Sequence, residues 1–398
     1  MLTQEPILTL TRRIESTQTE VFRAFTNTAS LRDWLCNAAQ VDVRTGGRIY
    51  LWWNNSYYTS GTFTNIERYD SLSFTWQGPG ESISEVHVSI DAEGNSTEVT
   101  VVHSGLLASE TAGTIGKLWE TALENLQTLL ETGNDLRLLR RPMFGLNGAE
   151  EMTPELAKQT GSPVSEGLRL GGVLPGMGAE AAGLQKDDIV TNLAGHEVPN
   201  FAAFVAAIEP HLAGDRVPVT FYRGSEKHTV DMVLSSRPAP VIPTSIKAMA
   251  DTAREVYTTL DKEMDALFEG VSEEAAERRP APGAWNAKEV MAHLIAVERD
   301  NQVWIAAITE DFDIEQPFHS NGRERIEAIV SAYPTIPILI EEMKRNEAMT
   351  VAMAAALSEE TQAHKHLVNQ IATSFTTFHT HHREHFAEIQ KLLSTPEA

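Results

Sequence analysis

The stretch FTTFHTHHREHFAEIQKLL, residues 375–393, places four histidines within a helical repeat of apolar residues. His381 and His385 stand four residues apart, so on a helix both side chains lie on one face and can reach a single point. A histidine pair at this spacing is typical of the helical half of a metal site, although a polar helix face or a hydrogen-bonded core gives the same pattern. The apolar residues that recur at steps of three and four, and that predict a helix over about 367–393, are Leu367, Ile371, Phe375, Phe378, Ile389 and Leu392.

Two adjacent histidines leave the choice of ligand open. His382 lies on the apolar side of the expected helix at least as squarely as His381. We prefer His381 because it precedes His385 by four residues, and His382 is the alternative. Glu384 and Glu388 are candidates to accept hydrogen bonds from imidazole N–H groups, and their alternative is to be solvated helix charges.

An upstream segment, AWNAKEVMAHLIAVERDNQVW at residues 284–304, predicts the helix that can supply a third ligand. Asn286 can cap its start, and Glu289, three residues later, completes a capping box. His293 falls on the apolar face of this helix and therefore points into a core. Three imidazoles from two helices would leave a divalent ion positive, with an open position at which the pKa of a bound water or thiol is lowered.

These segments together resemble the DinB family of four-helix bundles, and the resemblance extends over roughly residues 244–398. The residues that carry it are Trp285 to Glu289, His293-Leu294, His381, His385 and Glu388-Ile389. In that family three histidines at one end of the bundle bind a divalent metal, so the resemblance implies His293, His381 and His385 as ligands of zinc, nickel or iron. Members of the wider superfamily transfer thiols such as mycothiol or bacillithiol, and many have no assigned reaction. The implied activity is a metal-dependent thiol transferase or hydrolase, with a non-catalytic scaffold holding a structural metal as the alternative.

The composition of the chain limits the kinds of partner that it can bind. The sequence has 32 Lys and Arg against 55 Asp and Glu, a formal charge of −23, which argues against nucleic acid or an anionic membrane because both would repel the chain. The single cysteine, Cys36, excludes an intramolecular disulfide and any Cys-x-x-Cys motif, as in proteins of a reducing compartment. The first residues lack the layout of a signal peptide, and no apolar run of about eighteen residues occurs. We therefore expect a cytoplasmic protein of roughly two to four domains.

Residues 1–133 predict an α+β fold in which a helix packs on an antiparallel sheet. A strand over residues 6–14 precedes a helix opened by Thr17 and Glu20. Short alternating runs follow, separated by turn residues such as Gly78-Pro79-Gly80, and a long amphipathic helix closes the region.

This region resembles the START-like superfamily with its helix-grip fold, and specifically the domain named for the activator of Hsp90 ATPase. The residues that carry the likeness are Val21, Ala24, Phe25, Thr26, Trp34, Gly46-Gly47, His103-Ser104-Gly105, Gly116, Trp119 and Leu126. Family members enclose a hydrophobic cavity between sheet and helix, so the resemblance implies a hydrophobic small molecule as ligand. Trp52, Trp53, Trp76 and Trp119 are the candidate lining residues, with plain core packing as the alternative. We expect His103 to be structural.

Residues 140–236 resemble a mainly β PDZ domain of the bacterial protease-associated kind. The likeness rests on RPMFGLN (141–147), LRLGGVLPGMGAEAAGLQKDDIV (168–190), NFAAFVAAI (200–208) and VPVTFYRG (217–224). PDZ domains bind a terminal carboxylate on backbone N–H groups and add the peptide as a strand, so the resemblance implies the amides of Phe144, Gly145 and Leu146 as the peptide site. Asn147 to Glu151 depart from the expected alternation, and Asp187 replaces a usual glycine. The alternative is a PDZ fold kept as an interaction surface or spacer.

Three further expectations concern a helix near Asn200, the linker and the bundle. Asn200 can cap a helix whose inner face carries Phe201, Phe204, Val205 and Ile208. Residues 235–245 contain three prolines and predict an extended linker. Beyond the linker we expect the helices of an all-α bundle at about 246–268, 286–310, 322–356 (interrupted near Pro334 and Pro337) and 367–394.

Overall fold

The computed structural model describes residues 7–106, 109–237, 243, 245–310 and 320–394. Contacts between residues divide the chain into two compact units, one of residues 1–134 with 240–398 and one of residues 135–239. The first unit contains the N-terminal fold and the helical bundle, and the second contains the sheet region between them in sequence. The three domain boundaries expected from the sequence stay a prediction.

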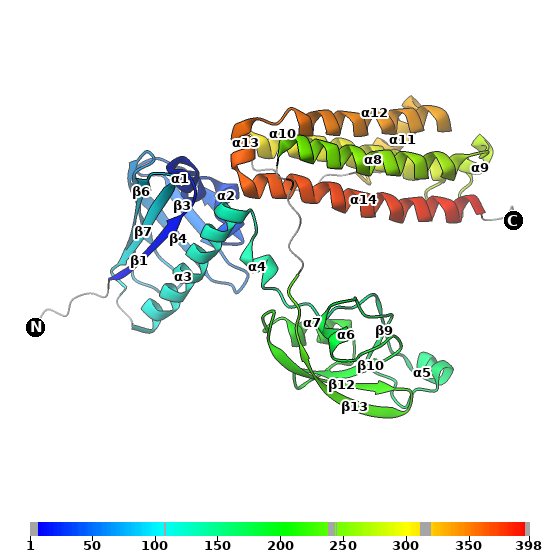
Figure 1. The fold of residues 1–398 in the computed structure, drawn as a ribbon, viewed down its shortest axis with the longest axis horizontal. Coiled ribbons are helices and arrows are strands. Elements are labelled where there is room, and N and C mark those ends of the chain that lie inside the picture. Colours follow the sequence, from blue (N-terminus) through cyan, green and yellow to red (C-terminus); the bar gives the residue numbers. More distant parts are fainter. Residues whose placement is uncertain (1–6, 107–108, 238–242, 244, 311–319, 395–398) are drawn as a thin grey trace, which may run out of the picture. The chain divides into compact units, whose positions relative to one another are not determined.

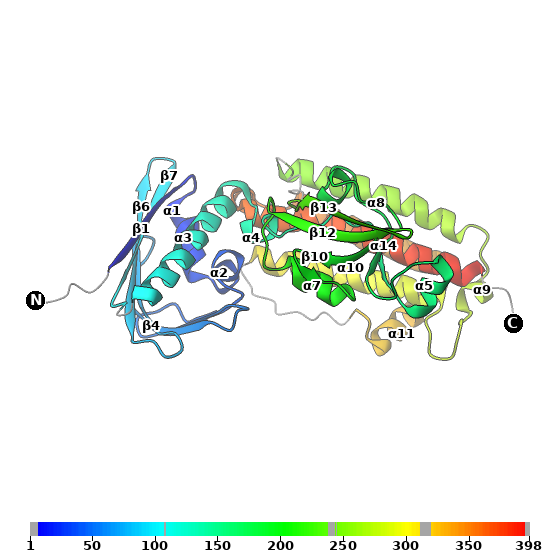
Figure 2. The ribbon, with the colours of Figure 1, turned by 90° about the horizontal axis from the view of Figure 1, so that it is seen from below.

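The N-terminal fold is an antiparallel sheet with a long helix packed on it (Figures 1 and 2). Its strands are β1 (Leu8–Ile14), β2 (Ala38–Val41), β3 (Arg48–Trp52), β4 (Tyr58–Glu67), β5 (Ser71–Trp76), β6 (Ser84–Glu93) and β7 (Ser96–Ser104). Its helices are α1 (Gln18–Thr26), α2 (Thr28–Trp34) and α3 (Ser109–Thr132). Within the described residues the strand order is β1-β7-β6-β5-β4-β3-β2. The α+β helix-grip arrangement expected for this region is confirmed.

Alternation along the strands decides which face of this sheet is buried. On β6, Val86, Val88 and Ile90 are fully buried and face the same side. Trp119 and Leu123 of α3 belong to the same core. Each such side chain contributes about 1.5–3 kcal/mol when it leaves water, so this two-layer contact holds the N-terminal fold together.

The second unit is a mixed region built on another antiparallel sheet. Its strands are β8 (Ala149–Glu151), β9 (Leu168–Leu170), β10 (Ile189–Leu193), β11 (His196–Glu197), β12 (Arg216–Arg223) and β13 (Glu226–Val233). Its helices are α4 (Leu136–Leu139), α5 (Pro154–Thr160), α6 (Gly178–Ala181) and α7 (Phe201–Ile208). The order among described strands is β13-β12-β10-β9-β8, with β11 paired to β10. Asp187 adopts a φ of +71°, which explains why a glycine would suit that position.

Helix α7 corrects one sequence expectation. Asn200 does cap it, with its side-chain oxygen 2.9 Å from the Ala203 amide. Its buried residues are Phe204 and Ala207, however, while Phe201 and Val205 are 50% and 43% exposed. A helix this short turns one narrow side to the sheet. Phe201 lies at its first position, where its ring stacks on that of Phe204. Phe204 and Ile208 pack on the core as expected, whereas the expected burial of Phe201 and Val205 is wrong.

Among the described residues the bundle has four long helices, and their bounds agree closely with the expected ones (Figure 1). They are α8 (Ile246–Phe268), α10 (Ala287–Thr309), α12 (Ile336–Ala355) and α14 (Lys365–Ser394), accompanied by the shorter α9 (Glu273–Glu277), α11 (Arg323–Ala332) and α13 (Glu359–Ala363). Asn286 and Glu289 form the expected capping box at the start of α10. The interruption expected near Pro334 and Pro337 separates α11 from α12, and Pro337 lies in the first turn of α12.

The start of α14 fastens the bundle to the N-terminal fold within the first unit. His366 Nδ1 lies 2.9 Å from the Gly133 carbonyl oxygen, and the Asn369 side-chain amide donates to the same oxygen at 2.9 Å. Lys365 Nζ donates to the Glu131 carbonyl at 2.5 Å. These contacts satisfy carbonyl groups at and just beyond the end of α3, where no further helical turn supplies donors.

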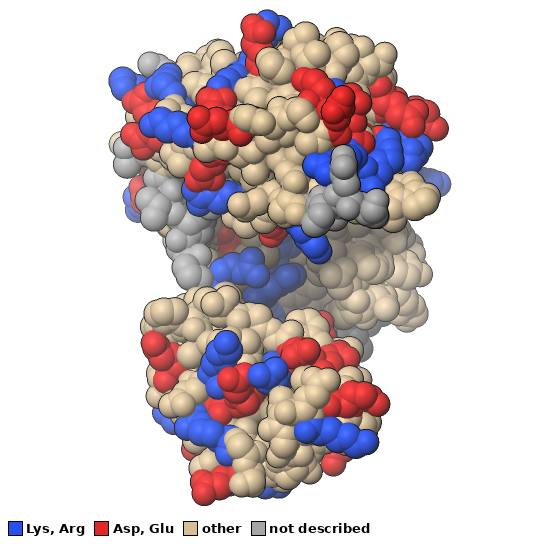
Figure 3. Space-filling model, turned by 90° about the vertical axis from the view of Figure 1, so that its right-hand side faces the viewer, with Lys and Arg blue, Asp and Glu red and all other residues tan. Residues whose placement is uncertain are grey.

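The surface mixes both signs of charge on the faces that Figure 3 shows, although the chain as a whole is strongly acidic. Among the described residues, no helix combines the length and the apolar character needed to cross a bilayer.

Candidate metal centre

Three imidazole rings meet inside the bundle. His293 comes from α10, and His381 and His385 come from α14. One nitrogen of each ring lies within 4.8 Å of one nitrogen of each other ring, and the Nε2 atoms of His293 and His381 are 3.2 Å apart. The ring centroids are separated by 4.5 to 5.4 Å. The structure thus brings together all three histidines that the sequence singles out.

Hydrogen bonds on the far side of two rings fix their orientation. His385 Nδ1 lies 2.8 Å from Glu388 Oε2, and His293 Nδ1 lies 3.3 Å from the Ser320 carbonyl oxygen. Because both acceptors require an N–H at Nδ1, the Nε2 atoms are left as lone-pair donors toward the common centre. Glu388 therefore makes the contact considered from the sequence, whereas Glu384 is exposed. Ser320 acts through its backbone, so its side-chain type gives no signal in the sequence.

Burial favours the neutral form of the His293 and His381 rings. Burial is the main cause that lowers the pKa of His293 to about 4, and the neighbouring His385 and His381 lower it further. Burial also lowers the pKa of His381, with the nearby His385 as a second cause. The neutral imidazole is the form that binds a cation. A site with three imidazole ligands and no cysteine thiolate suits zinc, nickel or iron(II). The donor set fits a divalent metal.

His382, the alternative ligand, lies elsewhere in the bundle. Its side chain is fully buried, and its Nε2 lies 3.9 Å from Glu347 Oε1 on α12. Residues one apart on a helix point about 100° apart, so His382 cannot join the ring cluster while His381 does. The four-residue spacing to His385 distinguishes His381, whose ring lies in the cluster, from His382, whereas a position on the apolar side of the helix does not.

The tryptophans of the N-terminal fold pack against one another. Trp76 and Trp119 are fully buried with ring centroids 5.6 Å apart, and Trp53 lies 5.9 Å from Trp76. The Trp76 Nε1–H donates to Tyr57 Oη at 2.9 Å. Strand alternation places Trp52 on the opposite face of β3 from the buried Leu51. These rings are packed as densely as in a core. A ligand cavity lined by them stays a prediction.

His103 has a structural hydrogen-bond pattern. The Trp119 Nε1–H donates to His103 Nδ1 at 3.2 Å, so the proton of the neutral ring lies on Nε2, which donates to Ser84 Oγ at 2.8 Å. The Ser84 hydroxyl donates in turn to the Trp76 carbonyl oxygen at 3.1 Å. The serine is not activated as a nucleophile, because the imidazole donates to it rather than accepting its proton.

Acid is expected to destabilise the N-terminal fold through His103. Burial lowers the pKa of His103 from 6.5 to about 4, so between these values the unfolded chain binds a proton that the folded chain does not. Stability is then fully present above pH 6.5 and falls by up to about 3 kcal/mol as the pH drops to 4. We expect His103→Gln to reduce this slope in urea unfolding at several pH values, and His87→Gln, at an exposed position on β6, to leave it unchanged. An unaltered slope in His103→Gln would contradict the assignment.

The loop expected to bind a peptide is held by its carbonyl groups. Phe144 is buried, and its carbonyl accepts from the Ala179 amide at 3.1 Å, while the Gly145 carbonyl accepts from the Leu174 amide at 2.8 Å. Gly145 adopts a φ of +92°, and a Cβ there would lie 2.6 Å from that of Met177. Among the described residues, no backbone carbonyl accepts a hydrogen bond from the amides of Phe144, Gly145 and Leu146. The exposed edge strand β8 follows this loop.

Comparison with known proteins matches two separate segments of the chain to families. Residues 15–131 match the family model described as Activator of Hsp90 ATPase homolog 1-like protein. Residues 257–389 match the model of the DinB superfamily. Among solved structures, the chain is similar to CalU16 from Micromonospora echinospora, with 25% identity, a TM-score of 0.27, and coverage of 30% of this chain and 71% of that one. An HSP90 activator from Plasmodium falciparum shows 23% identity and a TM-score of 0.29, covering 31% and 95%.

Two curated relatives are periplasmic proteases by name. A probable periplasmic serine protease do/HhoA-like of Haemophilus influenzae is 33% identical over 111 residues, which are 28% of this chain and 23% of that protein. The periplasmic pH-dependent serine endoprotease DegQ of Escherichia coli is 27% identical over 207 residues, 51% and 43% of the two chains. The chain thus spans less than half the length of either relative. What the comparisons show is an N-terminal segment of the Hsp90-activator-like type and a C-terminal helical segment of the DinB superfamily.

Proposed function

We propose that the bundle binds one divalent metal ion through His293, His381 and His385, and that this chain is a DinB-type metal-dependent thiol transferase or hydrolase. The observation that carries the proposal is the convergence of three imidazoles from two helices, with ligand atoms within 4.8 Å of one another. Two of these rings are held in the metal-binding tautomer by Glu388 and by the Ser320 carbonyl.

Zinc, nickel or iron(II) bound there would act as a Lewis acid that lowers the pKa of a thiol or water. The protein's own contribution is to fix the three rings and to limit water around them. His293 is 4% exposed, and the Trp285 ring lies 5.4 Å from its ring, centroid to centroid. Glu388 is nearly half-exposed, so it remains in contact with solvent while it holds His385. That position suits it to pass a proton between the site and water.

The other two regions would bring substrate or partner to this centre. In this proposal the N-terminal fold holds a hydrophobic small molecule, with Trp52, Trp53, Trp76 and Trp119 as candidate contacts. The middle unit would have a PDZ-like role and take the C-terminal end of a protein on the amides of Phe144, Gly145 and Leu146, next to the open edge of β8. The likeness to two periplasmic proteases supports a polypeptide as its ligand. A cytoplasmic location stays a prediction.

Metal titration tests the centre. We expect the full chain to bind one equivalent of zinc, nickel or iron(II), and His293→Ala, His381→Ala and His385→Ala each to bind at least about 100-fold more weakly. His379→Ala is the matched control, because it removes a histidine of the same helix that is not one of the three converging residues. Isothermal titration calorimetry and metal analysis after dialysis give the stoichiometry. Equal binding by the control and the three variants would contradict the site.

Thiol assays then separate the enzyme from the scaffold. The metal-loaded chain is assayed with bacillithiol, mycothiol and glutathione against an electrophilic acceptor, beside the His381→Ala variant. A thiol-dependent rate that is lost in the variant supports the transferase. Stoichiometric metal without such a rate, and without hydrolysis of ester and amide substrates, favours the alternative, a non-catalytic binding scaffold with a structural metal.

A further inference from the structure

A groove with a volume of about 380 Å³ lies between helices α8 and α12 of the bundle. This volume is within the roughly 300–1,000 Å³ of pockets that hold small organic ligands. One wall consists of small or apolar side chains of α12, namely Ala348, Val351, Ala352 and Ala355. The described lining residues include none of the three converging histidines, so the groove is distinct from the candidate metal centre.

Two carboxyl groups line this groove, Asp261 from α8 and Glu347 from α12. Glu347 is 2% exposed, and its Oε1 lies 3.9 Å from His382 Nε2, beyond hydrogen-bond distance. Glu347 Oε2 and Asp261 Oδ1 are buried, and among the described residues no donor makes a hydrogen bond to either atom. Because buried carboxylate oxygens normally accept at least one hydrogen bond, this pair indicates a place for a donor.

The two cationic side chains of the groove are paired with other carboxylates. Lys344 Nζ lies 2.7 Å from both carboxylate oxygens of Asp265, and Arg254 Nη1 lies 2.5 Å from Asp251 Oδ1. Neither aspartate is among the described residues that line the groove. These contacts draw the positive charges away from the carboxyl pair instead of supplying it with hydrogen bonds.

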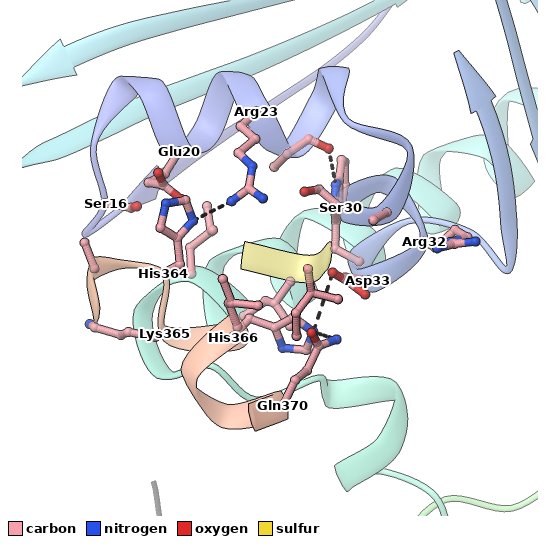
Figure 4. A pocket seen from close by; sticks show the side chains of 18 of the residues that line it. Ser16, Glu20, Arg23, Ser30, Arg32, Asp33, His364, Lys365, His366 and Gln370 are labelled. Atoms are coloured by element: carbon pink, nitrogen blue, oxygen red, sulfur yellow. Dashed lines mark hydrogen bonds and ion pairs between the residues drawn. The ribbon is translucent and has the colours of Figure 1, made fainter. Parts of the chain in front are cut away.

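Figure 4 shows another cavity of the first unit, in which the carboxylates do have partners: Glu20 lies beside His364 and Asp33 beside His366. Glu20 Oε2 is 2.7 Å from His364 Nδ1, and Asp33 Oδ2 is 3.6 Å from His366 Nε2. The chain itself therefore supplies the positive or hydrogen-bonding groups in that cavity. In the groove between α8 and α12, the two buried carboxylate oxygens receive no such group from the described residues.

A proton serves the carboxyl pair when the groove is empty. Burial, followed by the hydrogen bond and charge of Asp261, raises the pKa of Glu347 to about 10, so at pH 7 its carboxyl is protonated. The titratable groups that face Glu347 are Tyr257 and Asp261 from α8, Glu298 from α10, His382 from α14, and Lys344 on its own helix. An ammonium group carries both a positive charge and N–H donors, so it can replace that proton.

We propose that this groove binds a small organic ammonium ion, with its N–H donors on Glu347 and Asp261 and its apolar part along Ala348, Val351 and Ala352. The apolar wall suits an organic cation. A metal ion would need further ligands, and among the described residues the three-histidine cluster is the group whose ligand atoms lie close enough to hold one. The groove does not depend on that centre.

The test uses the full chain, with EDTA present, and a set of probes that share a phenylethyl body. Phenethylamine carries the proposed ammonium, its N-trimethyl derivative keeps the charge without N–H donors, 2-phenylethanol is neutral, and 3-phenylpropionate is negative. We expect saturable binding of phenethylamine by calorimetry or ligand-observed NMR at pH 7.5, and binding at least about tenfold weaker for the other three. Equal binding of 2-phenylethanol, or no binding of phenethylamine, would overturn the proposal.

Matched variants locate the ligand. Glu347→Gln should weaken phenethylamine binding by at least about tenfold, because it removes the charge and keeps the shape of the side chain. Glu327→Gln removes the same charge from an exposed position on α11 and should bind as the unchanged chain does. Ala348→Leu fills the groove while every charge is kept, so it should also abolish binding. Circular dichroism shows that each variant is folded, and unchanged binding in both Glu347→Gln and Ala348→Leu would contradict the site.

Two further measurements separate this site from others. His381→Ala should bind phenethylamine as the unchanged chain does, and loss of binding there would assign the amine to the histidine cluster instead. Calorimetry in two buffers of different ionisation enthalpy counts the protons exchanged. We expect about one proton to be released for each ammonium bound, because the ammonium replaces the proton on Glu347. Binding without proton release would show that the ammonium does not lie on this carboxyl.

Discussion

Replacing Glu347 by glutamine is expected to raise the free energy of unfolding by up to about 3 kcal/mol at pH 7. Glu347 is 2% exposed in the bundle interior. Burial, followed by the hydrogen bond and charge of Asp261 and the charge of Glu298, raises its pKa from 4.5 to about 10. Folding at neutral pH therefore requires this carboxyl to take up a proton. Glutamine has nearly the same shape and carries no charge to neutralise.

The proton at Glu347 determines whether the free energy of unfolding rises or falls with pH. Between pH 4.5 and 10 the folded chain holds a proton at Glu347 that the unfolded chain has lost, so stability falls by about 1.4 kcal/mol for each pH unit in that window. Glu347→Gln should remove this downward slope, and its gain over the unchanged chain should grow from pH 6 to pH 9. Urea unfolding at pH 6, 7.5 and 9 measures both. A variant that is less stable at all three values would contradict the buried neutral carboxyl.

Glu342 is the matched control on the same helix. Burial alone would raise its pKa, but the hydrogen bonds from Arg299 and Asn346 lower it overall, and Arg299 Nη2 lies 2.7 Å from Glu342 Oε1. Its carboxylate is therefore charged and paired when folded. Glu342→Gln should destabilise the bundle by about 1–3 kcal/mol at pH 7, opposite in sign to the change at Glu347.

Removing Lys288 is expected to cost about 2–3 kcal/mol. This lysine is 2% exposed, and its Nζ lies 2.6 Å from a carboxylate oxygen of Glu273, 2.6 Å from one of Glu277, and 2.7 Å from the Pro334 carbonyl oxygen. It thereby links α9, the start of α10 and the turn before α12. Breaking a buried ion pair by removing one partner costs about 3–5 kcal/mol, and the cost here lies at or just below the lower end of that range because both glutamates are partly exposed and keep their water.

Lys344 is the control for this change. It pairs with Asp265 at 2.7 Å, but both side chains are substantially exposed, so Lys344→Ala should change stability by less than about 1 kcal/mol. Thermal and urea unfolding of Lys288→Ala and Lys344→Ala, compared side by side, decide between the two. If the two variants were equally stable, the proposed role of the buried lysine would be wrong.

Local signals in the sequence gave the elements of the bundle. Caps and apolar repeats located α10 and α14, and the four-residue spacing favoured His381 over His382; in the structure the His381 ring lies in the ring cluster. No local pattern in the sequence predicted the contacts between segments that are distant in the chain. The pairing of Glu20 with His364 and the Ser320 carbonyl at His293 arise only from tertiary packing. In α7, apolar composition predicted a broad buried face, but composition does not reveal how little of so short a helix meets the sheet.

The unbroken length of α14 couples two distant places in the first unit. His366 and Asn369 hold its beginning to the end of α3, and His381 and His385 lie about 18 to 28 Å further along the same axis at 1.5 Å per residue. The number of residues between these two groups alone sets the angle between them about the helix axis. Inserting one residue between them would rotate the histidine pair by about 100° about the axis, whereas seven, nearly two whole turns, would restore its direction but displace it lengthwise by about 10 Å.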